Sequence, residues 1–280
     1  MTALDRVSFE FFPPKSAEGE AKLAAVRGRL DAARPEFYSV TYGAGGSTRD
    51  RTFDLVVTMR DEGRDAAPHL SIGNDDAASV LALVDRYREA GVNRIVALRG
   101  DIPSGMGGRG SIHYAEELVG LLRAHAGDHF HIAVAAYPEV HPDAATPATD
   151  LQHFAAKVTA GADEAITQYF YNADAYFDFV ERCTAAGVTV PIIPGIMPIT
   201  NRDGLLRFSA ACGADIPRWI ALRLDEYRDD PASLSAFGLD VVSALCERLV
   251  AGGAPGLHFY TMNQSKAPLE LLRRLGHPLD

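Results

Sequence analysis

The chain has 280 residues, of which 47% are hydrophobic and 23% are charged, a balance typical of globular proteins and not of disordered or fibrous ones. Acidic residues outnumber lysine and arginine by 37 to 27, so the formal net charge is −10. The basic residues form no cluster along the sequence, so we expect no nucleic-acid partner. The length suits either two domains or one α/β barrel, which commonly takes about 250 residues.

The N-terminal segment and the cysteines argue against export and against a metal centre. Asp5 and Arg6 interrupt the start of the chain, where a secretory signal would need an apolar run. The longest charge-free stretch, residues 184–201, contains prolines that break a membrane-spanning helix. The cysteines stand far apart and form no CxxC motif. We therefore expect reduced, buried thiols, a cytoplasmic location, no membrane association and no bound metal.

Short apolar β-rich runs alternate with amphipathic stretches along the whole chain. Strands are predicted at 7–12, 37–43, 68–73, 94–100, 131–137, 164–171, 190–196 and 256–262. Helices are predicted at 49–62, 77–90, 114–125, 149–160, 173–186, 201–211, 234–249 and 265–275. Glycines after the third, fifth and sixth strand–helix stretches mark the turns into the next strand. This order favours a single-domain α/β fold, a (β/α)8 TIM barrel spanning residues 1–280, over an open doubly wound sheet.

In such a barrel the active site lies at the carboxyl ends of the strands, and polar residues gather there in this sequence. Glu10 stands between Phe9 and Phe11, and a carboxyl group among aromatic rings should have a raised pKa that suits a general acid. The fourth strand ends in Leu98-Arg99-Gly100-Asp101, which brings a cation and a carboxylate together. A plain salt bridge between Arg99 and Asp101 is the alternative interpretation.

The fifth strand is followed by Tyr137, Glu139 and His141, and the sixth by Gln168 and a run of aromatic residues. Aromatic and amide side chains suit a flat heterocyclic ligand, although the aromatic run is equally compatible with core packing. Residues 105–110 match GxGxxG, but they begin too far after the strand to bind a dinucleotide, so we interpret them as a rim loop. No hydrolase elbow, zinc-protease motif or phosphate loop is present. Redox or one-carbon chemistry with a bound cofactor remains.

Eight motifs, in order along essentially the whole chain, resemble those of the methylenetetrahydrofolate reductase family. They are SFEFFPPK at 8–15, SVTYGAGGSTRDRT at 39–52, APHL at 67–70, VALRGD at 96–101, VAAYPEVHP at 134–142, TAGADEAITQYFY at 159–171, IIPGIMPI at 192–199 and HFYTMN at 258–263. The resemblance implies reduction of 5,10-methylenetetrahydrofolate to 5-methyltetrahydrofolate. FAD would relay the hydride, NADH or NADPH would donate it, and the protein would be a homo-oligomer.

The resemblance also assigns roles to individual residues. Glu10 would be the acid that helps to open the imidazolidine ring, and Asp101 would lie near flavin and pterin and stabilise the cationic intermediate. Substrate contacts are implied for Gln168, Thr41 and Leu224. FAD contacts are implied for Thr41, His69, Leu98, Arg99, Gly100, Asp101, Tyr114, Ala115, Tyr137, His141, Asp150, His153 and Lys157.

The sequence departs from the family at four of the positions that matter. Leu224 stands where the family usually has phenylalanine and Leu222 where it often has glutamine, and His153 and Ala156 stand where it commonly has asparagine and arginine. Losing the arginine removes a charge-assisted contact that contributes on the order of 1.5–3 kcal/mol. Two alternatives therefore stay open: direct hydride transfer from NAD(P)H to the folate without flavin, and a folate-binding one-carbon transferase on the same barrel.

Overall fold

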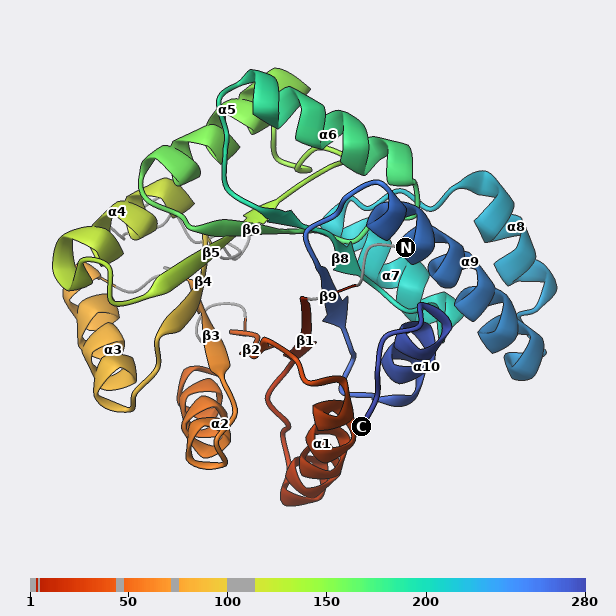
Figure 1. Ribbon diagram of the computed structural model, residues 1–280, viewed down its shortest axis with the longest axis horizontal. Helices are drawn as coiled ribbons and strands as arrows, with labels where there is room; N and C mark the ends of the chain where they lie inside the picture. Colours follow the sequence, from red (N-terminus) through yellow and green to blue (C-terminus); the bar gives the residue numbers. More distant parts are fainter. Residues whose placement is uncertain (1–3, 5, 44–47, 72–75, 100–113) are drawn as a thin grey trace.

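The structure is a computed structural model that describes residues 4, 6–43, 48–71, 76–99 and 114–280. Its strands are β1 (Val7–Phe11), β2 (Phe37–Val40), β3 (Ala66–Ser71), β4 (Arg94–Leu98), β5 (His131–Ala136), β6 (Glu164–Thr167), β7 (Ile192–Ile193), β8 (Gly195–Ile196) and β9 (Leu257–Tyr260). They pair in parallel in the order β7-β6-β5-β4-β3-β2-β1-β9-β8. Helices surround this sheet on its outer side (Figure 1). The predicted single-domain (β/α)8 TIM barrel is confirmed.

One strand of the eight-stranded barrel is split. β7 pairs with β6, and β8 pairs with β9, so the short strands on either side of Pro194 together form the seventh barrel strand and bring the two ends of the sheet together. Pro194 interrupts it because proline has no backbone N–H to donate. A Cβ atom on Gly195 would lie 2.2 Å from the carbonyl oxygen of Thr167, so this closing strand has room for glycine alone at that point.

Ten α-helices are formed by the described residues. They are α1 (Ala17–Leu30), α2 (Arg49–Asp61), α3 (Ala77–Glu89), α4 (Ala115–Ala126), α5 (Pro147–Thr159), α6 (Ala173–Ala185), α7 (Arg202–Cys212), α8 (Arg218–Glu226), α9 (Pro231–Ala251) and α10 (Lys266–Arg274), and a short 3-10 helix covers Asp31–Ala33. The turns after α3, α5 and α6 contain Gly91, Gly161 and Gly187 with positive φ, as predicted.

Two of these helices, α1 and α8, were not predicted. α1 contains Gly19 and Gly28, which disfavour a helix, and only Leu23, Val26 and Leu30 form its buried apolar face. Its sequence therefore shows a weak helical pattern. In α8, Ile220 is buried while Trp219 and Leu222 are more than half exposed, so apolar residues surround the helix and hide its amphipathic period.

The barrel interior holds both apolar and polar side chains. One apolar cluster takes a side chain from each strand from β2 to β7, namely Phe37, Ala67, Val96, Ala133, Ile166 and Ile193. Polar side chains from β1, β2, β3 and β9 also face inward, namely the buried Ser8, Ser39, His69 and His258 and the partly buried Glu10. Phe9 and Phe11 point outward into the layer between strands and helices. The chemistry-bearing side chains of β1 therefore face the inside of the barrel.

An ion-pair network fills the opposite, amino-terminal end of the barrel. Glu164 is 1% exposed and contacts Arg94 at 2.9 Å and Arg6 at 2.7 Å, and both arginines also contact Glu36 at 2.8 Å. Burial works against the charge on Glu164, but His131 and the two arginines outweigh it and lower its pKa to about 2. These ion pairs connect the residues just before β1 and β2 to β4 and β6, so removing one partner would leave a buried charge without compensation.

Candidate active site

A cavity of about 530 Å³ opens at the carboxyl ends of β3, β4 and β5, within the size range of small-molecule sites. The amino-terminal ends of α4 and α5 form its outer wall. Its lining consists of Tyr42, Ser71, Ala97, Leu98, Arg99, Tyr114, Ala115, Glu116, Ala135, Tyr137, His141, Asp143, Ala144, Ala145, Thr149, Asp150, His153 and Lys157. The cavity therefore lies where barrel enzymes bind their ligands.

Nine of the residues expected to contact FAD line this one cavity: Leu98, Arg99, Tyr114, Ala115, Tyr137, His141, Asp150, His153 and Lys157. Thr41 and His69 do not line it, and Gly100 and Asp101 lie outside the described residues. The rim loop expected at 105–110 also lies outside them. Residues from four separate segments of the chain thus meet around one space.

Among the described lining residues, Arg99 and Lys157 carry positive charge toward the cavity, and each has a protein partner. Arg99 forms an ion pair with Asp143 across the β4 and β5 loops, and the salt bridge considered between Arg99 and Asp101 is untested because Asp101 lies outside the described residues. The Nζ atom of Lys157 donates a hydrogen bond of 2.6 Å to the carbonyl oxygen of Ala135. Burial lowers the pKa of Lys157 to about 8, although Asp150 and Glu116 oppose the change. An anion in the cavity would favour the charged ammonium.

Aromatic rings and a fixed loop complete the wall. The rings of Tyr137 and His141 meet edge to face with centroids 4.4 Å apart, and Tyr114 stacks on His153 at 5.5 Å. Val140 has φ +74, a strained conformation for a β-branched residue, and directs the N–H of His141 to the Asp150 carboxylate at 3.1 Å. Burial, more than the nearby Arg99, lowers the pKa of His141 and favours the neutral imidazole.

Glu10 lies beside the cavity in a group of its own. Its Oε2 atom is 3.2 Å from Nε2 of His69 and 3.7 Å from Nε2 of His258, and the Nδ1 atom of His258 is hydrogen-bonded to the Ser8 hydroxyl at 2.7 Å. Burial raises the pKa of the Glu10 carboxyl, but the two imidazoles together outweigh burial and lower that pKa to about 2. The prediction of a raised pKa was therefore wrong, because Phe9 and Phe11 point away and histidines surround the carboxylate instead.

The three residues expected to contact substrate belong to three separate segments of the fold. The side-chain oxygen of Gln168 accepts a hydrogen bond from the N–H of Tyr169 at 3.0 Å at the end of β6. The backbone of Thr41 is hydrogen-bonded to Phe11 and to the Thr52 hydroxyl. Leu224 is fully buried on α8. Their predicted contacts with folate remain predictions.

The aromatic run after Gln168 belongs to the core, since Tyr169, Phe170 and Tyr171 are 7% exposed or less. Cys183 and Cys246 are buried free thiols as predicted, whereas Cys212 is partly exposed.

Several lining residues escaped the sequence reasoning. Glu116 and Thr149 lie in the first turns of α4 and α5, and their place could be inferred from the helix starts that follow two barrel strands. Tyr42 lines the cavity where Thr41 was expected, because neighbouring residues of an extended segment face opposite sides. Asp143 carried no signal of its own, since its role depends on its contact with Arg99.

In the described part of the chain, no group of three or more His, Cys, Asp and Glu side chains is placed to hold a metal ion. None of the described helices is both long enough and apolar enough to cross a membrane.

Comparison with known proteins places the chain in a family. A model of the methylenetetrahydrofolate reductase family matches residues 3–276. The 5,10-methylenetetrahydrofolate reductase of Escherichia coli (strain K12) is 40% identical over 271 residues, which are 96% of this chain and 90% of that protein. Methylenetetrahydrofolate reductase (NADH) 1 of Arabidopsis thaliana is 37% identical over 96% of this chain and 48% of its own length. One similar solved structure is an uncharacterized protein from Clostridium thermocellum that binds two copies of 5-methyl-5,6,7,8-tetrahydrofolic acid. It matches 98% of this chain and 94% of its own chain, with a TM-score of 0.63 and 17% identity. This likeness supports the fold. The chain belongs to the methylenetetrahydrofolate reductase family.

Proposed function

We propose that this protein reduces 5,10-methylenetetrahydrofolate to 5-methyltetrahydrofolate, with FAD as the bound cofactor and NADH or NADPH as the hydride donor. Membership of the family makes it an oxidoreductase, and its bacterial relatives carry the name of this reaction over 90% of their length. Plant relatives are named as NADH enzymes, which favours NADH as the first donor to test. A homo-oligomer is proposed on the family resemblance alone.

The observation that carries the proposal is the chemistry of the 530 Å³ cavity. A dinucleotide needs cations and helix amino termini for its diphosphate, and apolar or aromatic walls for its rings. The cavity supplies Arg99 and Lys157, the first turns of α4 and α5, and the rings of Tyr137 and His141. The residues present therefore fit FAD, although Ala156 leaves the α5 side with one cation fewer than the family pattern.

When bound, FAD would accept a hydride from the nicotinamide and pass it to the methylene carbon of the folate. The protein's own residues hold and orient it in this proposal. Lys157 and Arg99 would hold the diphosphate, and Asp150 would face ribityl or ribose hydroxyls while it keeps the His141 backbone in place. Asp101, outside the described residues, keeps its proposed place near flavin and pterin.

The proposed role of Glu10 concerns one proton. As the carbon–nitrogen bond of the imidazolidine ring breaks, the leaving amine nitrogen takes a proton, and the hydride then completes the methyl group. Because the two imidazoles hold the pKa of the Glu10 carboxyl at about 2, the proton would come from the Glu10–His69 pair as a unit, whose Oε2 and Nε2 atoms are 3.2 Å apart. The negative charge of Glu10 would also favour the cation that forms when the ring opens. Gln168 would hydrogen-bond the folate and Thr41 would contact it, whereas the expected contact by Leu224 does not fit its full burial on α8.

The first experiment is the visible absorbance spectrum of the purified protein, recorded again after incubation with excess FAD and desalting. A retained flavin band that NADH or NADPH bleaches without oxygen, and that methylenetetrahydrofolate restores, supports the proposal. Ala156 favours a second candidate, direct transfer from nicotinamide to folate, and a colourless protein that still oxidises NAD(P)H with the folate would establish it. A protein that binds folate but oxidises no NAD(P)H would point to the one-carbon transferase.

A further inference from the structure

The segment after β9 is hydrogen-bonded to the end of β1, the strand that carries Glu10. The Thr261 hydroxyl donates to the backbone carbonyl of Glu10 over 2.6 Å. The side-chain amide of Asn263 contacts Phe12 twice: its oxygen accepts from the backbone N–H at 3.0 Å, and its nitrogen donates to the backbone carbonyl at 2.9 Å. We call these three hydrogen bonds the β1 clamp.

The clamp replaces strand pairing where pairing stops. β1 is paired with β9 as far as Glu10 and with β2 as far as Phe11. The next residues, Pro13 and Pro14, have no N–H and cannot continue a ladder. The Asn263 amide therefore acts as a substitute strand residue, with one donor and one acceptor, for the last residue before the prolines. Phe12 itself is 43% exposed, so few packing contacts hold it from the outside.

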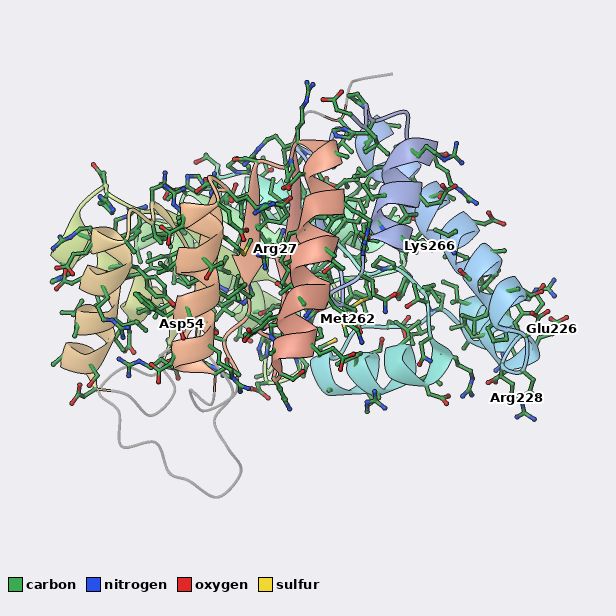
Figure 2. All side chains as sticks on the ribbon, turned by 90° about the horizontal axis from the view of Figure 1, so that it is seen from below. Arg27, Asp54, Glu226, Arg228, Met262 and Lys266 are labelled. Carbon is green, nitrogen blue, oxygen red and sulfur yellow. The ribbon has the colours of Figure 1, made fainter. Side chains whose placement is uncertain are left out.

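The clamp is built on unfavourable backbone geometry. Met262 and Asn263 have φ values of +51 and +55, two consecutive residues other than glycine in the left-handed region. Asparagine tolerates this region and methionine does not, so the surrounding bonds must impose it. The N–H of Asn263 donates to the Thr261 hydroxyl at 3.1 Å, which ties the turn together. Figure 2 shows Met262 toward the end of the barrel where α7 lies, with Lys266 opening α10 beyond it.

We propose that Asn263 is a positioning residue for Glu10, acting through Phe12 and with the help of Thr261. The inference rests on the proposed function. The Glu10 carboxylate must stay within reach of both His69 and the folate, and it stands two residues before the point where Asn263 holds the chain. Without the hydrogen bonds from Asn263 to Phe12, the last residues of β1 can shift. A displacement of about 1 Å at a reacting group can lower the rate roughly a hundredfold.

The test compares two glycine variants of the same turn. In N263G the backbone keeps its left-handed conformation but loses the amide, whereas in M262G the clamp is intact and the strained side chain is removed. Stopped-flow absorbance without oxygen would measure flavin reduction by NADH and flavin reoxidation by methylenetetrahydrofolate separately. We expect N263G to reduce its flavin within about twofold of the wild-type rate and to lose at least about tenfold in reoxidation. M262G should stay within about twofold in both steps.

Three results would overturn the role of Asn263: wild-type reoxidation in N263G, equal losses in both steps, or the same loss in M262G. Hydrogen exchange at the Phe12 amide should accelerate in N263G, and unchanged exchange would overturn the clamp itself. If N263G does not fold, T261V removes the donor to the Glu10 carbonyl and should show the same selective loss. A wild-type protein that transfers no hydride to folate overturns the proposed function instead, so the two failures are distinguishable.

Discussion

Replacing Lys157 by methionine should weaken FAD binding and remove most of its dependence on pH. The Lys157 ammonium is buried beside the cavity, and burial lowers its pKa to about 8. A diphosphate binds the charged form, so wild-type affinity should be highest below about pH 8 and fall by up to tenfold for each pH unit above it. Methionine fills a similar volume without the charge, so its affinity should be low and flat across this range.

The size of the loss follows from the contact that disappears. A hydrogen bond to a charged group contributes on the order of 1.5–3 kcal/mol, which corresponds to roughly a 10- to 150-fold change in dissociation constant. The carboxylates of Asp150 and Glu116 already offset part of the Lys157 charge, so we expect the lower part of that range, about ten- to thirtyfold. The variant also leaves the Ala135 carbonyl without its 2.6 Å donor, so a modest fall in melting temperature should accompany the weaker binding.

Fluorescence titration of FAD into cofactor-free protein, between about pH 6.5 and about pH 9.5, measures both effects. Lys22→Met is the matched control, because Lys22 is 73% exposed on α1 and pairs there with Glu18, far along the chain from the cavity residues. It should bind FAD as the wild type does. If the wild-type affinity is the same at both ends of the pH range, or if folded Lys157→Met binds as tightly as the wild type, the diphosphate does not lie against Lys157.

Further predictions concern catalysis, acid stability and packing. Glu10→Gln should leave flavin reduction by NADH intact and slow folate reduction by about a hundredfold or more in stopped-flow assays; equal losses would refute its role in proton transfer. Because the pKa of Glu164 is lowered to about 2, its stabilisation is present above about pH 4.5 and is lost as pH falls toward 2. Glu164→Gln should therefore lower the melting temperature at pH 7, and the difference in melting temperature between the variant and the wild type should become smaller in acid. A difference that does not change with pH would contradict this. Gly195→Ala should lower the free energy of unfolding, measured in urea, by about 1–3 kcal/mol. Gly28→Ala should not lower it, because a Cβ atom there would have nothing within 4 Å. Equal effects would mean that the closing strand tolerates a side chain.

Glu10 shows where sequence reasoning succeeds and where it stops. Its place at the barrel mouth follows from the length of an apolar run and the two prolines after it, which is local information. Its pKa does not, because strand alternation turns Phe9 and Phe11 outward and leaves Glu10 facing His69 and His258, which are 59 and 248 positions away in the chain. The pKa of a side chain depends on the residues that are close to it in space, and those residues can be far away in the sequence.

The ion-pair partner of Arg99 at the cavity also depends on residues that are distant in sequence. A salt bridge between Arg99 and the nearby Asp101, which lies outside the described residues, stays an untested alternative, whereas Arg99 does pair with Asp143 on the loop after β5. Parallel strands bring their carboxyl ends to one rim, so each loop of a barrel meets the loops of the strands beside it. A sequence can show that a rim residue is charged, but the order of strands around the barrel decides which other loop satisfies it.

β3 links the two halves of the proposed reaction. His69 and Ser71 stand two residues apart on this strand and face the same way, His69 toward Glu10 and Ser71 into the cofactor cavity. Two residues of a strand span about 6.6 Å, roughly the width of a fused ring system. In the proposed reaction, the Glu10–His69 pair would supply the proton and the cavity would hold the hydride carrier, so the spacing between them depends on β3. Because backbone pairing with β2 and β4 fixes that strand, and not a loop, the two parts of the site are held in register with each other.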